Sequence, residues 1–512
     1  MPFHYKALVI VMFLTTISFA LAKPAMTRVM GERDFDVRRN AWLALTFVAF
    51  VMPEFWSYLI VSGAIIVFAA KKDSNPVALF VFLMLVIPPV SRDLPGFGIV
   101  AYIIPIDNLR LLSILILLPI GIRLMQRTAE MRLVASPVTG RGGYLLAADT
   151  LLVMYLALQV LTAFPHQSVT ATIRMTVELA LFTFLPYFVV SRSCDTREKM
   201  VETMAAFALS TLLLVPLAIY EVVRGAQLYG ELQARWDGPN LGEYLTRGDF
   251  LRAQVTAGHS IVLGVSMSVS LGLWLFLQDR IPGKWRWLGY LALVAGNVCA
   301  LSRGPWVGAL VCLTVYLLSG PDIVKRASKG AALVAALSGI ALVTPYRDTI
   351  VDYLPFIGTA DSGSVTYRQE VAARSWDLIM ANPFLGNPYY IQNMEELRQG
   401  QGIIDIVNSY AAVGLSYGLI GAGLFVGFFA VAAFGCWRAT QRWAQADADM
   451  SLMGASLLAT LLGLLTIIAT VSQILSIPYL ECALAGMALA FVEQTRIAVL
   501  QRGASHANLS TA

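Results

Sequence analysis

Residues 410–435 read YAAVGLSYGLIGAGLFVGFFAVAAFG, a run of 26 residues without one charged side chain. An α-helix needs about 20 apolar residues to cross the hydrocarbon core of a bilayer, so this run predicts a membrane-spanning helix. Similar runs recur along the 512 residues, of which 57% are hydrophobic and 13% charged. Soluble domains usually carry about 25% charged residues. The chain is therefore predicted to be a polytopic membrane protein.

The apolar runs predict an all-α fold, a polytopic membrane helix bundle of about 14 (12–15) transmembrane helices with one large periplasmic loop containing short helices. Around Pro53-Glu54, the mostly apolar stretch 41–70 favours a short hairpin of two helices. Within the large loop, segment 366–380 predicts a further helix that ends before Asn382-Pro383. The predicted membrane helices cover residues 7–22, 41–52, 55–70, 77–90, 109–125, 145–164, 171–190, 200–220, 257–278, 287–302, 305–319, 330–344, 410–435, 450–470 and 475–495.

These helices divide the chain into seven parts. The parts are an N-terminal helix and basic linker (1–40), N-terminal membrane helices (41–220), a periplasmic loop (221–256), membrane helices (257–344), a large periplasmic loop (345–409), C-terminal membrane helices (410–495) and a cytoplasmic tail (496–512). Loops as long as the two periplasmic ones are usually functional or disordered. Aromatic residues such as Trp376, Phe384 and Tyr389 favour order in the larger loop.

The placement of lysine and arginine predicts the orientation of the bundle, because cytoplasmic loops carry an excess of both. One set of alternate loops holds 19 basic residues and is predicted to be cytoplasmic, together with the C-terminus. These residues are Lys71, Lys72, Arg123, Arg127, Arg132, Arg141, Arg192, Arg197, Lys199, Arg280, Lys284, Arg286, Lys325, Arg326, Lys329, Arg438, Arg442, Arg496 and Arg502.

The N-terminus allows two interpretations. Residues 7–22 form an apolar run of signal-peptide length, and Ala20-Leu21-Ala22 resembles a cleavage site. Cleavage would place residues 23–40 outside, although the arginines of that segment oppose export. We therefore favour a retained helix and keep a cleaved signal peptide as the alternative.

Cysteines and histidines predict no bound metal and no other cofactor. The five cysteines form no CxxC pair, and the four histidines are scattered along the chain. The sequence has no P-loop, Rossmann glycine pattern, HExxH or paired-aspartate motif. ATP-driven transport and metal-dependent transfer from nucleotide sugars therefore lack support. The net charge of +5 is modest, and no nucleic-acid partner is expected.

Charged residues near the outer ends of the helices are the first candidates for a site. Arg174 and Glu178 lie four residues apart in a membrane helix, where charges are costly and often functional, although the two can also satisfy each other. Arg252 precedes the helix at 257, where a guanidinium either holds an anionic head group or snorkels to the interface. His259 acts either as a general base or as a simple hydrogen-bonding group.

Further candidates lie at the next outer turn and in the large loop. Arg303 belongs to a tight turn at Ser302–Trp306, where it either faces a cavity or caps the preceding helix. Arg368 begins the helix predicted within the loop. Asp405 and Asn408 stand where the chain re-enters the membrane, either at the mouth of a central cavity or on a solvated loop surface.

Several strings occur in a fixed order over residues 245–435. They are the segment 252–264 with His259, LSRGPWVG at 301–308, Arg368 and Trp376 followed by NPFLG at 382–386, VNSY at 407–410 and YGLIG at 417–421. Together these strings resemble the O-antigen ligase and Wzy-type polysaccharide polymerase superfamily of bacterial membrane proteins. The remaining N-terminal part of the chain is similar to that superfamily only in hydropathy.

The resemblance implies a membrane glycosyltransferase that acts at the periplasmic face of the bacterial inner membrane. An acceptor hydroxyl would attack a glycan linked to undecaprenyl pyrophosphate, with inversion, and arginines would neutralise the departing pyrophosphate without a metal. The expected partners are this lipid-linked glycan, membrane lipid and other polysaccharide export components. The candidate catalytic residues are Arg252, Arg368, His259 and Asp405, and the candidate substrate-binding residues are Arg303, Arg174, Asn408, Tyr410 and Trp376.

One position departs from the family pattern. Ligases of this family have a histidine where this chain has Val407, so His259 or Asp405 would take the acceptor proton, or the transition state needs little help from a base. This departure favours polymerisation of exopolysaccharide or capsule repeat units over ligation of a finished glycan to another acceptor. A secondary transporter or flippase is the third hypothesis, although such proteins commonly carry two repeats and the sequence shows none.

Overall fold

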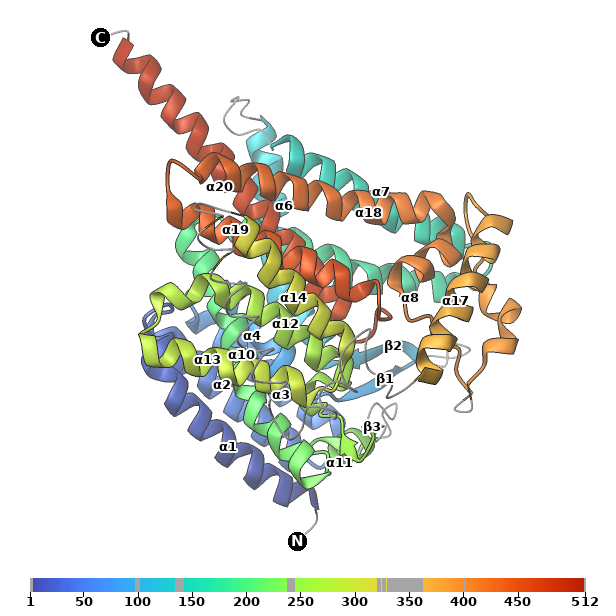
Figure 1. Cartoon of the computed structure of the whole chain (residues 1–512). Coiled ribbons are helices and arrows are strands. Elements are labelled where there is room, and N and C mark those ends of the chain that lie inside the picture. The colour runs from blue at the N-terminus through green and yellow to red at the C-terminus, as the bar shows by residue number, and fades with distance from the viewer. Residues whose placement is uncertain are drawn as a thin grey trace. The chain divides into compact units, whose positions relative to one another are not determined.

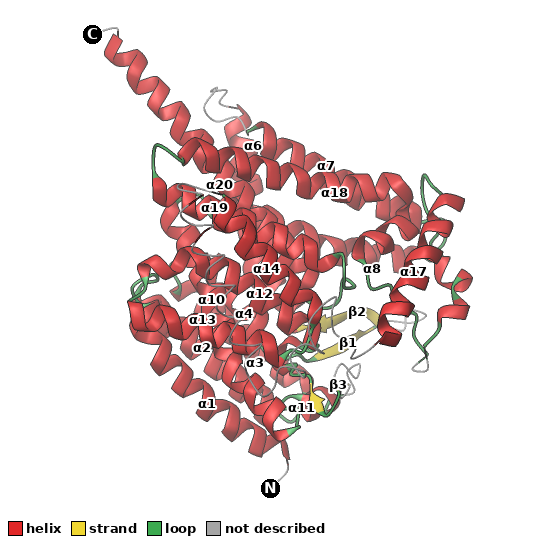
Figure 2. Cartoon of the chain, in the orientation of Figure 1, coloured by secondary structure: helices red, strands yellow, loops and turns green. Residues whose placement is uncertain are grey.

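The structure of the chain is a computed structural model that describes residues 3–96, 102–133, 142–236, 245–319, 324, 328, 362–399 and 402–510. These residues form helices almost throughout, with two short antiparallel β-hairpins (Figures 1 and 2), so the predicted all-α fold is confirmed. The chain packs as two compact units. Unit 1 comprises residues 1–142, 180–302 and 475–512, and unit 2 comprises residues 143–179 and 303–474.

Each unit contains its own set of helices. Unit 1 holds α1 (Phe3–Met26), α2 (Glu32–Val51), α3 (Phe55–Lys72), α4 (Pro76–Val86), β1 (Ser91–Pro95), β2 (Tyr102–Asp107), α5 (Asn108–Leu112), the π-helix η1 (Ser113–Leu117), α6 (Leu118–Leu133), the π-helix η2 (Ala180–Phe184), α9 (Leu185–Ser193), α10 (Arg197–Arg224), α11 (Gly230–Ala234), β3 (Thr246–Arg247), β4 (Phe250–Leu251), the 3-10 helix η3 (Val255–Ala257), α12 (Ser260–Leu277), the 3-10 helix η4 (Gln278–Arg280), α13 (Gly283–Cys299) and α20 (Ile477–Ser510). Unit 2 holds α7 (Gly143–Ala163), α8 (Val169–Leu179), α14 (Arg303–Leu318), α17 (Ser362–Ala381), the 3-10 helices η5 (Tyr390–Asn393) and η6 (Glu395–Leu397), α18 (Ser409–Trp443) and α19 (Ala448–Ile468).

Ten helical stretches among the described residues are long and apolar enough to cross a membrane. Two shorter apolar helices, α4 and α14, accompany them. The chain is therefore a multi-pass membrane protein, as predicted, while the predicted number of about 14 spans is not reached within the described ranges. The helix predicted at 330–344 lies outside the described residues. The helix predicted at 366–380 is present as α17.

Residues 41–70 form the hairpin of two helices that the sequence favoured, with the break at Met52–Glu54. The first helix of the hairpin is longer than predicted, because α2 begins at Glu32. Much of the predicted basic linker is thus helical. The reason is that two charged residues of this segment, Asp34 and Arg38, are buried against partners far along the chain, which a hydropathy pattern does not reveal.

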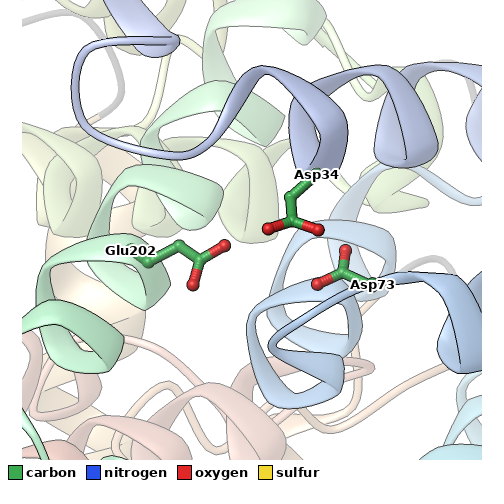
Figure 3. Close-up of side chains that lie close together, drawn as sticks. All are labelled: Asp34, Asp73 and Glu202. Atoms are coloured by element: carbon green, nitrogen blue, oxygen red, sulfur yellow. The ribbon is translucent and has the colours of Figure 1, made fainter.

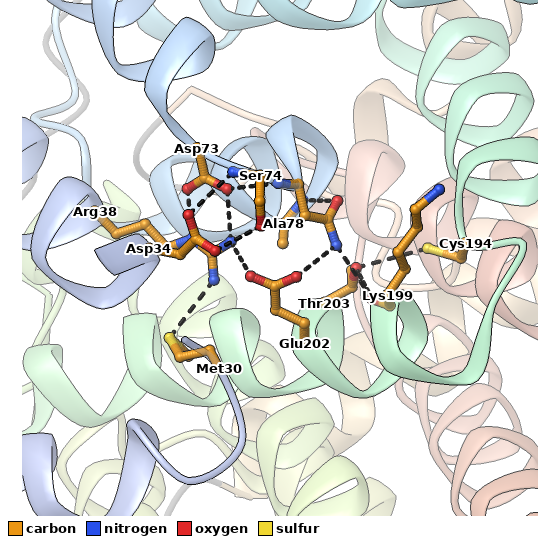
Figure 4. A network of polar contacts seen from close by, with 11 residues as sticks. Met30, Asp34, Arg38, Asp73, Ser74, Ala78, Cys194, Lys199, Glu202 and Thr203 are labelled. Carbon is orange, nitrogen blue, oxygen red and sulfur yellow. Dashed lines mark hydrogen bonds and ion pairs between the residues drawn. The ribbon is translucent and has the colours of Figure 1, made fainter. Parts of the chain in front are cut away.

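An ion-pair network in unit 1 buries these charges. Arg38 donates to the carboxylate of Asp73 from Nε and Nη2, at 2.8 Å each, and to Glu202 from Nη2 at 2.6 Å (Figure 4). Asp34 accepts the hydroxyl of Ser74 at 2.6 Å. The carboxylates of Asp34, Asp73 and Glu202 point toward one another (Figure 3), with ligand atoms within 4.8 Å. The guanidinium supplies the positive charge of this cluster and joins α2, the α3–α4 turn and α10.

Contacts between the connecting segments of unit 1 show which of them lie at the same end of its helices. The ion-pair network places segment 34–38 at the same end as the turn 73–75 and the start of α10. At the other end, His4 Nδ1 lies 3.8 Å from Glu231 Oε2. Helix α1 packs against α2 and α10 between these ends. Segment 23–40 therefore lies with loops that were predicted to be cytoplasmic, and the choice between a retained helix and a cleaved signal peptide stays a prediction.

Replacement of Arg38 by alanine should strongly lower the thermal unfolding temperature of the detergent-solubilised protein. Asp73 and Glu202 would stay buried without their partner, and breaking a buried ion pair typically costs about 3–5 kcal/mol. The matched control is Arg39→Ala, because Arg39 forms a part-exposed pair with Asp36, where a salt bridge contributes about 0–1 kcal/mol. Equal losses of thermal stability in the two variants would contradict the role of the network.

Candidate functional site

In unit 1, two arginines, one in the β3–β4 hairpin and one directly after it, lie at the C-terminal end of α13. Arg247 Nη1 donates to the carbonyl of Leu301 at 2.9 Å, and Arg252 Nε donates to that of Ala300 at 3.4 Å. The backbone N–H of Ala253, next along the chain, donates to the last residue of α13 at 3.0 Å. Carbonyls at the end of a helix lack partners within the helix and carry partial negative charge. The hairpin arginines therefore satisfy this helix end.

His259 is the N-cap residue of α12. Its Nδ1 accepts the backbone N–H of Ile261 at 3.1 Å. Burial, and to a smaller extent the positive charge of Arg252, lowers the pKa of His259 to about 4, so the ring is neutral at neutral pH. A neutral imidazole that accepts at Nδ1 carries its proton on Nε2. The cap therefore favours His259 as a hydrogen-bond donor over the alternative of a general base.

In unit 2, Asp405 links α17 to the connection that follows α19. Its Oδ1 accepts the hydroxyl of Ser472 at 2.6 Å, and its backbone N–H donates to the hydroxyl of Tyr367 at 3.0 Å. Tyr367 precedes Arg368, which is exposed on α17. The start of α17 is therefore held beside Asp405, and Arg368 and Asp405 lie at the same end of unit 2.

Helix α14 begins at Arg303, and its first turn packs against the connection that follows α19. The neighbouring Gly304 packs so closely on Thr470, near Ser472, that a Cβ at Gly304 would lie 2.5 Å from the Thr470 hydroxyl. Arg303 is half-buried. It stands at the N-terminal end of a helix, where the helix dipole favours negative charge. Both alternatives for Arg303, a residue that faces a cavity and a cap of the preceding helix, stay predictions.

Asn408 and Tyr410 hold the start of α18. The side-chain oxygen of Asn408 accepts the backbone N–H groups of Tyr410 at 2.9 Å and Ala411 at 3.1 Å, which makes Asn408 an N-cap. The hydroxyl of Tyr410 donates to the carbonyl of Leu465 at 2.9 Å, and its ring packs edge-on against Phe425. Both residues therefore have structural roles at the site, whatever they contribute to substrate binding.

The NPFLG and YGLIG strings meet at a kink in α18. Leu419 donates from its backbone to the carbonyl of Pro383 at 2.7 Å. Gly418 has φ +64° and ψ −168°, and Gly386 has φ +70°, a region that favours glycine. A Cβ at Gly386 would lie 2.6 Å from the backbone nitrogen of Gly418. Two strings that support the family resemblance thus form one contact, which fixes the end of α17 against α18.

The remaining predicted residues lie on α8 and α17. Arg174 and Glu178 are both half-buried in α8. The large loop contacts the turn that precedes α8, because the hydroxyl of Tyr389 donates to the carbonyl of His166 at 3.1 Å and their rings pack edge-on. Trp376 is 60% exposed on α17. The large loop therefore contacts the α7–α8 turn at this point, and its order stays a prediction.

An apolar groove of about 230 Å³ lies between α1, α10, α12 and α13 in unit 1. Leu14, Pro216 and Trp274 are among its lining residues. The hydroxyl of Ser18, which also lines the groove, donates to the carbonyl of Leu14 at 2.8 Å. The groove suits hydrocarbon, and it offers little to a sugar or a phosphate.

Three residues that organise these sites were not predicted from the sequence. They are Glu221, Arg247 and Ser472. The turn at Gly248-Asp249 between two short strands is typical of a hairpin and would have indicated that Arg247 lies beside Arg252. Glu221 and Ser472 give no comparable local signal, because their partners are distant in the sequence.

Acidification from pH 7 to pH 5 should destabilise the wild-type protein more than the His259→Asn variant. The pKa of His259 is about 4 in the folded protein, below the value of about 6.5 for an unperturbed histidine. The stability that depends on the neutral ring is present above about pH 6.5 and is lost as the pH falls toward 4. Asparagine keeps the N-cap but does not titrate. Thermal unfolding at the two pH values tests this, and equal pH dependence in both proteins would refute it.

Replacement of Gly418 by alanine should loosen the large loop. The new methyl group would collide with the backbone of Phe384 and Leu385, and φ +64° is strained for alanine. Limited proteolysis should then cut faster near α17. Gly423→Ala on the same helix is the control, because a Cβ at Gly423 meets nothing within 4 Å. Identical proteolysis of the two variants would argue against the glycine contact.

Comparison with known proteins bears on the same segments. Residues 288–426 match the family model described as O-antigen ligase. The matched range includes Arg303, Arg368 and Asp405, together with both strings of the glycine contact. No curated protein matches the chain. The family match confirms the resemblance of this chain to the O-antigen ligase and Wzy-type polymerase superfamily of membrane proteins.

Proposed function

We propose that this protein polymerises oligosaccharide repeat units carried on undecaprenyl pyrophosphate into exopolysaccharide or capsule. The observation that carries the proposal is the arrangement in unit 2. There the bonds of Asp405 hold the Arg368 end of α17 near the start of α18, and the glycine contact fixes the other end of α17 against α18, within the range that matches the ligase family. The reaction would be a metal-independent, inverting glycosyl transfer at the periplasmic face of the bacterial inner membrane, with the C-terminus in the cytoplasm.

Positive charge is the main catalytic contribution under this proposal. As the glycan leaves its carrier, negative charge develops on the pyrophosphate, and stabilisation of such charge is usually the largest single term in catalysis. Arg252 of unit 1 and Arg303 and Arg368 of unit 2 are each a candidate source of this charge, since a planar guanidinium matches phosphate oxygens. The Nε2–H of His259 adds a neutral donor next to the charge of Arg252. Arg174 and Trp376 would contact the glycan or its carrier.

The acceptor hydroxyl must lose a proton as it attacks the anomeric carbon. Asp405 is the better of the two candidates for this step, because the Nδ1 of His259 is engaged in the helix cap. The carboxylate of Asp405 is half-buried, and Ser472 fixes its orientation. Val407, two residues away, stands where family ligases carry histidine and has no group that accepts a proton. This difference supports polymerisation.

Ligation of a finished glycan to another acceptor is the second candidate function. It is favoured by the family description itself, which names O-antigen ligase. Analysis of lipid-linked glycans in a deletion strain separates the two functions. A single repeat unit that accumulates on the carrier supports polymerisation. A ladder of long glycans on the carrier supports ligation and overturns the proposal.

Replacement of Arg252 or of Arg368 by alanine should lower polymer synthesis by about 100-fold or more, as loss of one charge-stabilising donor does in other enzymes. Single lipid-linked repeats should accumulate, as measured by gel analysis of extracted glycans. Arg398→Ala is the matched control, because Arg398 lies in the same large loop and pairs with Glu395 on the surface. Unchanged polymer length in both test variants would remove these arginines from the site.

A further inference from the structure

Glu221 is a buried carboxylate near the end of α10. Only 1% of the surface of Glu221 is exposed. All of its hydrogen bonds in the described part of the chain come from backbone N–H groups and none from a basic side chain. An unpaired carboxylate is costly to bury, so its presence here requires strong and specific donors.

Three backbone N–H groups supply those donors. Leu228 donates to Oε1 at 2.9 Å, and Gln254 and Val255 donate to Oε2 at 2.8 and 3.0 Å. Leu228 lies in the turn that follows α10, whereas Gln254 and Val255 lie just before α12. One carboxylate therefore joins two separate connections of unit 1.

The segment from Arg252 to His259 depends on such bonds. Val255 has φ +49°, a strained value for a β-branched residue, and Gly258 has φ +74°. Strained backbone persists only where its surroundings over-determine it. Ala253 is bound to the end of α13, and Thr256 donates to the carbonyl of Leu85 at 2.6 Å. Glu221 provides the third attachment, and it holds the strained residue itself.

We propose that Glu221 is a positioning residue for Arg252 and His259. Its carboxylate fixes the backbone between them, so that the guanidinium and the Nε2–H of the imidazole keep a constant separation and direction. This inference rests on the proposed function, in which both groups face the pyrophosphate. Glu221 itself does not touch the substrate under this proposal.

Hydrogen exchange on the purified full-length protein in nanodiscs tests the attachment. In Glu221→Gln the side chain keeps one acceptor oxygen and turns an NH₂ group toward N–H donors, so peptides covering 250–258 should exchange on the order of tenfold faster. Peptides within α12 and α13 should be unchanged. The matched control is Glu198→Gln, which alters an exposed glutamate on the same helix. Unchanged exchange at 250–258 would overturn the proposal.

Glycan synthesis tests the positioning role. Glu221→Gln should reduce polymer synthesis, and Glu221→Gln/Arg252→Ala should be no worse than Arg252→Ala alone, because residues that act as a unit are non-additive. Additive losses would indicate a general structural role and overturn the proposal. If Arg252→Ala retains full activity, the role that the proposed function gives to Arg252 fails, whereas the exchange experiment still decides whether Glu221 holds the segment.

A second variant, Glu221→Asp, distinguishes loss of positioning from a general loss of folding. Glu221→Asp keeps the charge but shortens the side chain by one methylene group, so it cannot reach both connections as glutamate does. Exchange at 250–258 should be intermediate between wild type and Glu221→Gln, and polymer synthesis should fall in parallel with it. Faster exchange together with wild-type polymer synthesis would contradict positioning.

Discussion

Every backbone amide and carbonyl that leaves a helix in apolar surroundings must find a partner within the protein, because lipid offers none. This constraint governs the non-helical segments of the chain. The end of α13 is satisfied by Arg247 and Arg252, the start of α12 by His259, and the start of α18 by Asn408. The polar residues of the candidate sites are thus the residues that allow irregular backbone to exist there.

The same constraint explains why structural and chemical roles coincide in these sites. A side chain that caps a helix is held rigidly, and rigid donors are what stabilisation of a developing charge requires. His259 illustrates this, since its cap fixes the tautomer and burial keeps the ring neutral. Asp405 is a second case, since Ser472 and Tyr367 hold its side chain and its backbone. A substitution at such a residue therefore changes both the local backbone and the group that would act on the substrate.

Much of the fold could be predicted from the sequence, because apolar runs of membrane length admit few alternatives. Helices such as α3, α7, α14 and α19 appear close to their predicted ranges. The predicted start of α2 was wrong because the charge of Arg38 is neutralised by Asp73 and Glu202, which lie far along the chain. Hydropathy also gave no sign of the β1–β2 hairpin. Long-range pairing of polar groups is the information that local patterns lack.

Prediction of the site was more limited. Composition and loop position selected Arg252, Arg303, Arg368 and Asp405, and the structure places the last three in unit 2 near the connection after α19. Their roles in catalysis stay predictions. Glu221 could not be selected from the sequence, because a single glutamate near a helix end is common. Its bonds to Gln254 and Val255 form only in the folded chain.

The contact between Gly386 and Gly418 restricts how this protein can diverge. Each glycine has a left-handed backbone, and a Cβ on either one would collide with the backbone of the facing segment, so a change at one cannot be repaired by a change at its partner. In an exposed turn between them, a Cβ at Gly402 would meet nothing within 4 Å. Relatives should accordingly tolerate insertions and new surface chemistry in that interval, and thereby new acceptors, while the two glycines are inherited as a pair.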